Sequence, residues 1–348
     1  MGHDRARRRR GCAGGALQRV LERLAPHGGL ARLAAVGHRI VHGGATFLHP
    51  TFLDDSAIEA LHGVERIDPA HLPAEPSIVS AVLQLAPGLP QVACFDTAFH
   101  ASLPRVARLL AIPRCFEARG VRRYGFHGLS YQFQIEELAR VAGESAARGR
   151  VIMAHLGSGS SLAAARYGAC VDTTMGFTPN SGVVMGSRSG DLDAGLVVHL
   201  LRTERLDADG LDTLLAKESG LLGVFGVSGD VRDLLAREAT EPACADALAL
   251  YCHDVRKAIG ALATSVGGLD TLVFAAGVGE NSPVVRARVC AGLAHLGVTL
   301  DNGRNAAGDA VISASASACT VRIVHTDEEM IIARAAYRLL SSPGESSS

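Results

Sequence analysis

The stretch VIMAHLGSGSSLAAARYGACVDTT, residues 151–174, predicts short apolar strands joined by turns. Its glycine–serine turn would point bare backbone N–H groups at one spot, an arrangement that suits a phosphate. The only lysines of the chain, Lys217 and Lys257, both lie outside any G-x-x-x-x-G-K-[ST] run, which excludes a P-loop. A phosphate bound at this turn would therefore need another source of positive charge.

Strand and helix patterns alternate on both sides of this hairpin, which indicates an α/β protein. Upstream, residues 33–44 and 89–100 read as strands, and 16–26, 56–64 and 77–85 read as helices. Downstream, 269–282 reads as a strand, a glycine turn and the start of a helix, and 321–340 reads as a strand and a final helix with Thr326 as N-cap. A long helix is expected over 244–266, where one face is apolar. That face consists of Leu248, Cys252, Val255, Ile259, Leu262 and Val266.

The composition is that of a globular protein. The chain has 348 residues, long enough for two domains, with 48% hydrophobic and 20% charged residues. A formal net charge of −1 argues against a general nucleic-acid surface, and no stretch is long and apolar enough to span a bilayer. Eight cysteines without a C-x-x-C pair fit a reducing cytoplasm.

Three polar clusters lie beside glycines, and each also has an ordinary structural explanation. Arg39 sits inside an apolar strand, where a structural Arg–carboxylate pair would explain it, and Asp96 ends a buried strand, where it could cap a helix. His127 could be a core histidine, and Arg188 a turn arginine. Taken singly these signals are weak, and only their order and spacing make them specific.

That ordered set resembles the acetate kinase family (acetokinases, including propionate and butyrate kinases). The matching blocks run from about Gly37 to Leu340, and the two longest are the signature motifs of the family. In order they are HRIVHGG, FDTAFH, YGFHGLSYQ, HLGSGSS, TTMGFTP with GVVMGSRSGDLD, AAGVGENS and TDEEMIIA.

The resemblance implies a duplicated actin-like, sugar-kinase-like α/β fold with two domains around a nucleotide cleft. The expected first domain comprises 1–98 and 327–348, and the expected second comprises 99–326. The implied reaction is reversible transfer of the ATP γ-phosphoryl group to acetate or propionate, with Mg²⁺ as cofactor. A cytoplasmic homodimer is implied, with neither nucleic acid nor membrane as a partner.

Residue by residue, the resemblance also implies catalytic roles. Arg39 and Arg188 match the arginines that grip the carboxylate and the transferring phosphoryl group, and their planar forks suit that charge. Asp96 matches the catalytic acid, which can orient an arginine or metal-bound water. His127 matches the histidine that stabilises the transition state, and Glu328 matches the magnesium ligand. Magnesium and the arginines would supply the positive charge that the glycine–serine turn lacks.

The resemblance assigns binding roles to three further groups. The acyl tail would meet Val41, Phe126 and Pro179, beside Arg39. The phosphates would follow His155, Leu156, Gly157, Ser158 and Gly159. The adenosine side would be held by Asp230, Val231 and Arg232 together with Gly277, Val278, Gly279, Glu280 and Asn281.

This chain departs from the family pattern at three places. Ser158 replaces an asparagine, and Ala70, next to a retained His71, replaces a pocket leucine, which predicts room for an extra methylene. The strand and lysine-bearing loop with which family members open are missing ahead of Gly37. This predicts a poorly active, less stable 348-residue form, and it leaves a catalytically weak nucleotide-binding relative as the alternative. An actin-type assembly module is disfavoured, because it would give Arg39, Asp96, His127 and Arg188 no reason to occur together.

Overall fold

The structure is a computed structural model that describes residues 15, 18–64 and 75–341. The contacts between residues divide the chain into two compact units. Unit 1 consists of 1–98 and 327–348, and unit 2 consists of 99–326. The chain therefore passes between the units twice, after Ala98 and after Thr326.

Residues 151–174 form strands joined by turns in unit 2, as the sequence predicts. They form three antiparallel strands, and two parallel strands from later in the chain extend the sheet in the order β6-β5-β4-β7-β8. The strands are β4 (Val151–Leu156), β5 (Ser160–Arg166), β6 (Ala169–Thr173), β7 (Thr271–Ala275) and β8 (Thr320–Ile323). The glycine–serine turn joins β4 to β5.

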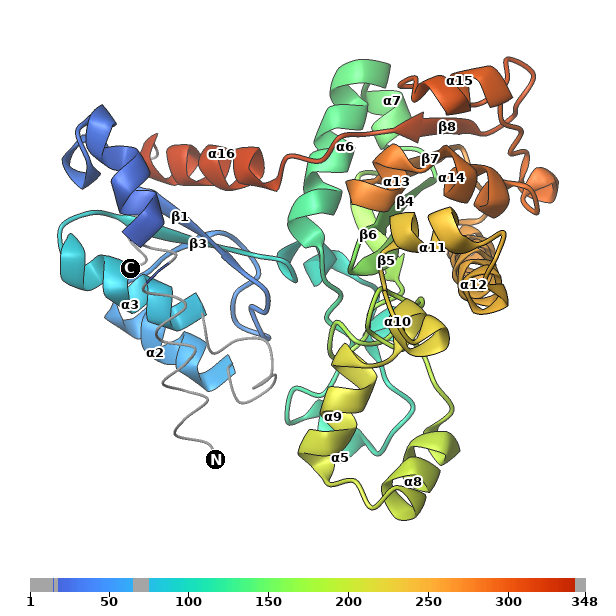
Figure 1. Ribbon diagram of the computed structural model, residues 1–348. Coiled ribbons are helices and arrows are strands. Elements are labelled where there is room, and N and C mark those ends of the chain that lie inside the picture. Colours follow the sequence, from blue (N-terminus) through green and yellow to red (C-terminus); the bar gives the residue numbers. More distant parts are fainter. Residues whose placement is uncertain (1–14, 16–17, 65–74, 342–348) are drawn as a thin grey trace. The chain divides into compact units, whose positions relative to one another are not determined.

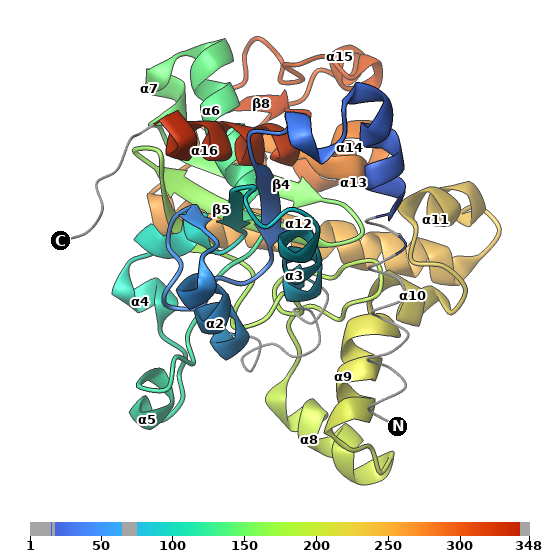
Figure 2. The ribbon, with the colours of Figure 1, turned by 90° about the vertical axis from the view of Figure 1, so that its left-hand side faces the viewer.

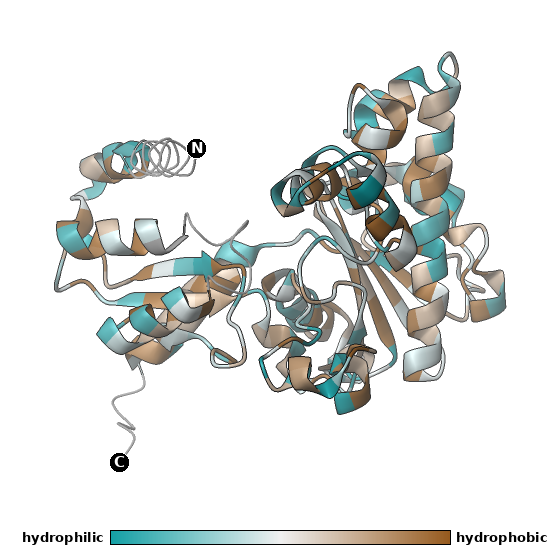
Figure 3. Ribbon diagram, turned by 90° about the horizontal axis from the view of Figure 1, so that it is seen from below, coloured by the Kyte–Doolittle hydropathy of each residue, from teal (hydrophilic) through white to brown (hydrophobic). Residues whose placement is uncertain are grey.

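Helices cover both faces of this sheet because successive side chains of a strand point to opposite faces. Ile152, Ala154 and Leu156 of β4 pack into one apolar cluster with α12 (Pro242–Val266). The alternate β4 residues pack into a second cluster with α6 (Gly128–Ala142). All six residues of the predicted apolar face of α12 are buried, which confirms that prediction. Figure 3 shows the brown strands of unit 2 flanked by helices of mixed hydropathy.

The remaining helices of unit 2 surround these layers. In Figures 1 and 2, α8 and α9 extend away from the sheet of unit 2. The α-helices are α4 (Arg105–Arg108), α5 (Arg114–Glu117), α7 (Glu144–Ala147), α8 (Ala194–Thr203), α9 (Ala208–Lys217), α10 (Gly220–Phe225), α11 (Val231–Arg237), α13 (Ala276–Asn281), α14 (Pro283–Cys290) and α15 (Asn302–Ala307). The 3₁₀ helices are η3 (Ala98–Ser102), which begins at the boundary with unit 1, and η4 (Ala294–Leu296).

Unit 1 contains a three-stranded sheet in the order β1-β3-β2, with β1 and β3 parallel. Its apolar cluster joins the strands to the helices α2 and α3, and α16 also contacts β1 and β3. Figure 1 shows β1 and β3 between α16 and the α2–α3 pair. The elements are η1 (Ala25–His27), η2 (Leu30–Arg32), β1 (Val36–Ile40), β2 (Thr51–Phe52), α2 (Asp55–Val64), α3 (Glu75–Leu85), β3 (Gln91–Phe95) and α16 (Glu328–Ser341).

Two local predictions are corrected by the structure. The N-cap of α16 is Asp327, whose Oδ1 accepts the Met330 N–H at 2.8 Å, so the prediction of Thr326 is wrong. The glycine turn expected in 276–282 is the helix α13, which begins directly after β7. The backbone of Ala276 is left-handed there, with φ 63°, and its N–H is donated to a Glu280 carboxylate oxygen at 2.8 Å. Across the described part of the chain, no helix has the length and apolar character needed to cross a bilayer.

Candidate active site

Arg39 joins two acidic side chains in unit 1. Its Nε and Nη2 donate to the two carboxylate oxygens of Asp96 at 3.0 and 2.7 Å, and its Nη1 lies 2.8 Å from Glu328 Oε2. Arg39 lies close to Asp96 because of the register of the parallel strands β1 and β3. Arg39 is opposite Cys94, and Asp96 is two residues further along the chain. The Asp96 side chain is 2% exposed and the Arg39 side chain is 41% exposed. A buried carboxylate therefore holds an arginine that is itself partly accessible to water.

Glu328 offers a carboxylate of the kind that Mg²⁺ prefers as a ligand. Burial raises the pKa of Glu328, and the positive charge of Arg39 opposes that shift. Within the described ranges, no three His, Cys, Asp or Glu side chains gather closely enough to hold a metal by themselves. Mg²⁺ in kinases is commonly bound through one or two carboxylates, with water and substrate phosphates completing its shell. The donors present fit that mode, with Glu328 as a carboxylate ligand.

In unit 2, His127 and Arg188 converge on the glycine–serine turn. A Cβ built on Gly159 would lie 3.3 Å from Arg188 Nη1 and 3.4 Å from His127 Nε2. The His127 ring stacks on His155, with centroids 4.1 Å apart. Arg188 is steadied by the Pro179 carbonyl, which accepts from its Nη1 at 3.2 Å. A guanidinium and an imidazole therefore both lie beside the turn that the sequence assigns to phosphate.

Gly159→Ala should fill this space. The backbone of Gly159 is not left-handed, so alanine is tolerated there, but its methyl group would crowd both Arg188 and His127. We expect kcat to fall about 10-fold or more, because small displacements of positioned groups are costly in catalysis. Gly260→Ala, in α12 with nothing near its Cβ, is the matched control and should leave turnover unchanged. Steady-state kinetics would check this, and equal rates in the two variants would contradict it.

His100 supports the loop that carries His127. Its Nε2 lies 2.9 Å from the Phe126 carbonyl, and its Nδ1 lies 3.2 Å from Cys170 Sγ. Gly125 has φ +70°, and a Cβ there would lie 2.5 Å from the His100 ring. The imidazole therefore packs directly against the backbone before His127. Burial lowers the pKa of His100 to about 4.

The low pKa of His100 predicts acid sensitivity. An unfolded histidine binds a proton below its ordinary pKa of 6.5, whereas the folded one stays neutral down to about pH 4. The unfolded state thus binds more protons in this window, and the free energy of unfolding should fall as pH drops from 6.5 to 4, by about 3 kcal/mol in all. Urea unfolding at pH 7 and pH 4.5 would measure the loss. His100→Gln, which keeps a donor for Phe126, should flatten this dependence, and an unaltered slope would contradict the assignment.

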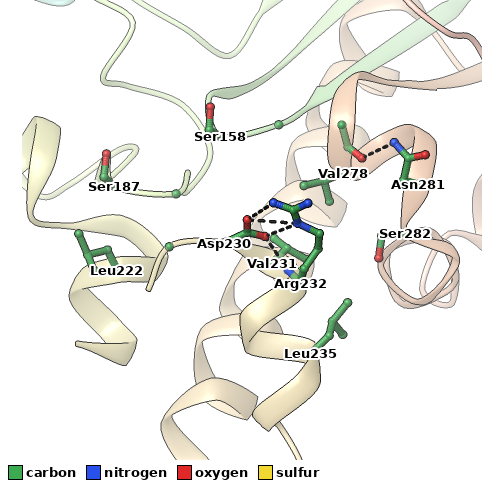
Figure 4. Close-up of a pocket in the computed structure, with 14 residues that line it drawn as sticks. Ser158, Ser187, Leu222, Asp230, Val231, Arg232, Leu235, Val278, Asn281 and Ser282 are labelled. Carbon is green, nitrogen blue, oxygen red and sulfur yellow. Dashed lines mark hydrogen bonds and ion pairs between the residues drawn. The ribbon is translucent and has the colours of Figure 1, made fainter. Parts of the chain in front are cut away.

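A cavity of about 660 Å³ lies beside the same turn in unit 2. Figure 4 shows Ser187 and Leu222 facing Val278, Asn281 and Ser282 across Asp230 and Arg232. Its lining residues are Gly157, Ser158, Gly186, Ser187, Leu222, Gly229, Asp230, Val231, Arg232, Leu235, Gly277, Val278, Asn281 and Ser282. The Arg232 side chain holds the pKa of Asp230 below its usual range.

The cavity brings together most of the residues expected to bind ATP, but not all of them. Five of the expected residues do not line it: His155, Leu156, Gly159, Gly279 and Glu280. The Leu156 side chain is buried in the apolar core, and the Glu280 carboxylate accepts the N–H groups of Ala276 and Thr326.

The residues expected around the acyl tail are spread over both units. Val41 directly follows β1 in unit 1, and Phe126 and Pro179 belong to unit 2. Phe126 is 1% exposed, and its carbonyl faces His100. Ala70, which the sequence analysis expects at the position of a pocket leucine, and the neighbouring His71 lie outside the described residues.

The sequence analysis missed a contact between two glycines that line the cavity, Gly186 and Gly229. A Cβ on Gly229 would lie 2.2 Å from the Gly186 carbonyl oxygen, so the two backbones touch. Gly186 N–H in turn donates to the Ser158 carbonyl at 3.0 Å, which links this contact to the phosphate turn. The glycines of MGSRSG and VSGD are the only signal for it in the sequence. Each alone is compatible with an ordinary turn.

Comparisons with known proteins show the family of this chain. The pattern of the Acetokinase family matches residues 8–334. Acetate kinase of Rhodopseudomonas palustris is 47% identical over 310 residues, covering 88% of this chain and 77% of that protein. Acetate kinase of Coprothermobacter proteolyticus is 43% identical over 334 residues, covering 93% of this chain and 84% of that protein.

Solved structures extend the likeness to the fold. The crystal structure of Porphyromonas gingivalis acetate kinase matches with a TM-score of 0.85 and 37% identity, over 90% of this chain and 79% of that one. A propionate kinase from Francisella tularensis matches with a TM-score of 0.87 and 32% identity, over 92% and 83%. The duplicated actin-like, sugar-kinase-like fold expected from the sequence is confirmed.

Proposed function

This chain belongs to the acetokinase family, and from that premise we propose that it reversibly transfers the γ-phosphoryl group of ATP to acetate or propionate. The products are an acyl phosphate and ADP. The observation that carries the proposal is the convergence of Arg188 and His127 on the turn beside the cavity. Nothing in the comparisons supports the alternative of a catalytically weak nucleotide-binding relative.

The proposed reaction requires positioned substrates and stabilised charge, and it does not require a general base. A carboxylate is already deprotonated at neutral pH, so its oxygen attacks the γ-phosphorus without proton removal. Arg188 and His127 would donate hydrogen bonds to the equatorial oxygens, whose charge is spread in the transition state. Arg39, oriented by Asp96, would steady the acceptor carboxylate or the transferring group with the part of its side chain that reaches water.

The cavity would hold the nucleotide. Gly157, Ser158, Asp230, Val231 and Arg232 would contact the phosphate and adenosine sides, together with Gly277, Val278 and Asn281. Glu328 would be a ligand of the magnesium that accompanies ATP, and that ion would supply charge neutralisation at the phosphates. Val41, Phe126 and Pro179 would border the acyl tail.

We extend the proposal to the organisation of the protein. Units 1 and 2 would be the two actin-like domains, with the nucleotide carried mainly by unit 2. A cytoplasmic homodimer is expected, and the near-zero net charge disfavours a nucleic-acid partner.

The test is acyl phosphate formation by the purified 348-residue chain. ATP, magnesium and acetate are supplied, and the product is trapped with hydroxylamine as the hydroxamate. Hydroxamate that depends on all three supports the proposal. ATP binding measured by calorimetry in the same preparation, without any product, would overturn it in favour of the binding relative.

Propionate should be used at a rate comparable to acetate. Ala70 stands where family members carry a leucine, and an extra methylene in an apolar pocket is worth only about 1–3 kcal/mol. Tolerance is therefore expected rather than exclusive preference. The ratio of kcat/KM for the two acids would be measured in the wild type and in Ala70→Leu, which should favour acetate. Strong discrimination against propionate in both proteins would contradict the expectation.

A further inference from the structure

His127 is held by a hydrogen bond at its Nδ1 in unit 2. Its Nδ1 lies 2.8 Å from Ser161 Oγ, and Ser161 Oγ lies 2.5 Å from the Tyr131 hydroxyl. Ser161 and Tyr131 are both 0% exposed, so water does not compete for these contacts. The opposite nitrogen, Nε2, is the one that lies near Gly159 and Arg188.

The direction of these hydrogen bonds follows from what each group can donate. The Tyr131 hydroxyl is buried, and among the described residues its hydrogen-bond partner is Ser161 Oγ, so the phenol proton is donated to Ser161. Ser161 then has its own hydroxyl proton to give to His127 Nδ1. An imidazole that accepts at Nδ1 carries its proton on Nε2, toward the phosphate turn.

Neighbouring rings and side chains also fix the place of the His127 imidazole. The ring is stacked on His155, and Arg188 Nη1 lies near the same Gly159 position. His155 is held in the same way, because its Nδ1 lies 2.8 Å from Ser130 Oγ, which accepts from Gln134 Nε2 at 3.0 Å.

We propose that Tyr131 and Ser161 are positioning residues that hold His127 in the Nε2–H tautomer, so that it donates to the transferring phosphoryl group. This inference rests on the proposed function. It adds two residues that contact no substrate and act only through His127. Their loss should lower kcat and leave nucleotide affinity in place.

The chain offers a matched control on the other face of β5. Ser160 and Ser161 point to opposite faces, and Ser160 Oγ lies 3.0 Å from the hydroxyl of Tyr251, which is also buried. Tyr251→Phe removes a buried tyrosine hydroxyl beside a β5 serine, as Tyr131→Phe does, but it touches no imidazole. Loss of stability alone should affect the two variants similarly.

The experiment compares Tyr131→Phe, Ser161→Ala and Tyr251→Phe with the wild type at one pH. We expect kcat to fall about 10-fold or more in the first two, the scale of a group that supports a direct donor, with KM for ATP changed less than about two-fold. Tyr251→Phe should keep kcat near the wild-type value. The double variant Tyr131→Phe/Ser161→Ala should lose little more than Ser161→Ala, because both act through one nitrogen.

The tautomer itself gives a readout that does not depend on activity. The chain has 14 histidines, and the ¹⁵N signals of His127 are assigned as those absent from His127→Gln. A protonated Nε2 in the wild type, and a mixture of tautomers in Ser161→Ala, are expected. A proton on Nδ1 in the wild type, or a kcat loss no larger than that of Tyr251→Phe, would overturn the inference. A wild type that forms no acyl phosphate would instead overturn the proposed function and leave the tautomer result intact.

Discussion

Arg188→Ala should lower kcat by about 10²-fold or more while ATP still binds. Removing one preorganised donor from charge that develops in the transition state costs this much. Arg188 is anchored by the Pro179 carbonyl and by Met185 Sδ, at 3.2 and 3.7 Å from its Nη1. These contacts fix the direction of the guanidinium, so its planar fork would already be oriented for the proposed contact with the phosphates.

Steady-state kinetics and calorimetry with ATP would measure the two parts of this prediction. Arg232→Ala is the matched control, because Arg232 lines the cavity, is proposed to contact the adenosine side, and is 89% exposed. Its loss should raise KM for ATP and leave kcat largely intact. Arg188→Lys should recover only part of the activity, since an ammonium group keeps the charge but not the fork. Near-wild-type kcat in Arg188→Ala would remove this arginine from the mechanism.

Asp96→Asn should have an effect of similar size for a different reason. The amide keeps the shape of the carboxylate but loses the charge and one of the two acceptors that hold Arg39 Nε and Nη2. Arg39 would then be bound mainly by Glu328, and its guanidinium would turn toward that residue. We expect kcat to fall about 10²-fold, because the orientation of an arginine that meets substrate is lost.

The matched control is a second bidentate arginine–carboxylate pair, Arg288 with Glu238. Arg288 Nη1 and Nη2 donate to the two carboxylate oxygens of Glu238 at 2.7 and 2.9 Å in unit 2. Glu238→Gln should cost a comparable, modest amount of stability, about 1 kcal/mol, without changing kcat. Thermal unfolding and hydroxamate formation would be measured for both variants. Equal activity in Asp96→Asn and Glu238→Gln would show that the Arg39–Asp96 pair is structural only.

Most strands and the long helix α12 could be predicted because they depend on local patterns, whereas α6 and most short helices of unit 2 were not predicted. The six apolar positions of α12 recur with the helical period, and all are buried. The hairpin of β4, β5 and β6 follows from apolar runs broken by turn residues. One error concerned a whole segment, because the expected glycine turn is the helix α13, and the other concerned a helix end, where one hydrogen bond decides. Asp327 and Thr326 are both good N-caps by composition, and only the Asp327 to Met330 contact distinguishes them.

The sequence by itself determined the α/β class, the family and the identity of the polar residues, because each rests on residue types at fixed spacings along the chain. Tertiary structure alone decided which of these residues meet. The contact of Gly186 with Gly229, the stacking of His127 on His155, and the Tyr131–Ser161–His127 chain join segments about 30 to 40 residues apart in unit 2. Such pairings depend on strand register and on which face of a strand a side chain takes, and a one-residue shift in register would exchange Ser160 for Ser161. Local propensity carries no information about that choice, since it is fixed by the packing of α6 and α12 on opposite faces of one sheet.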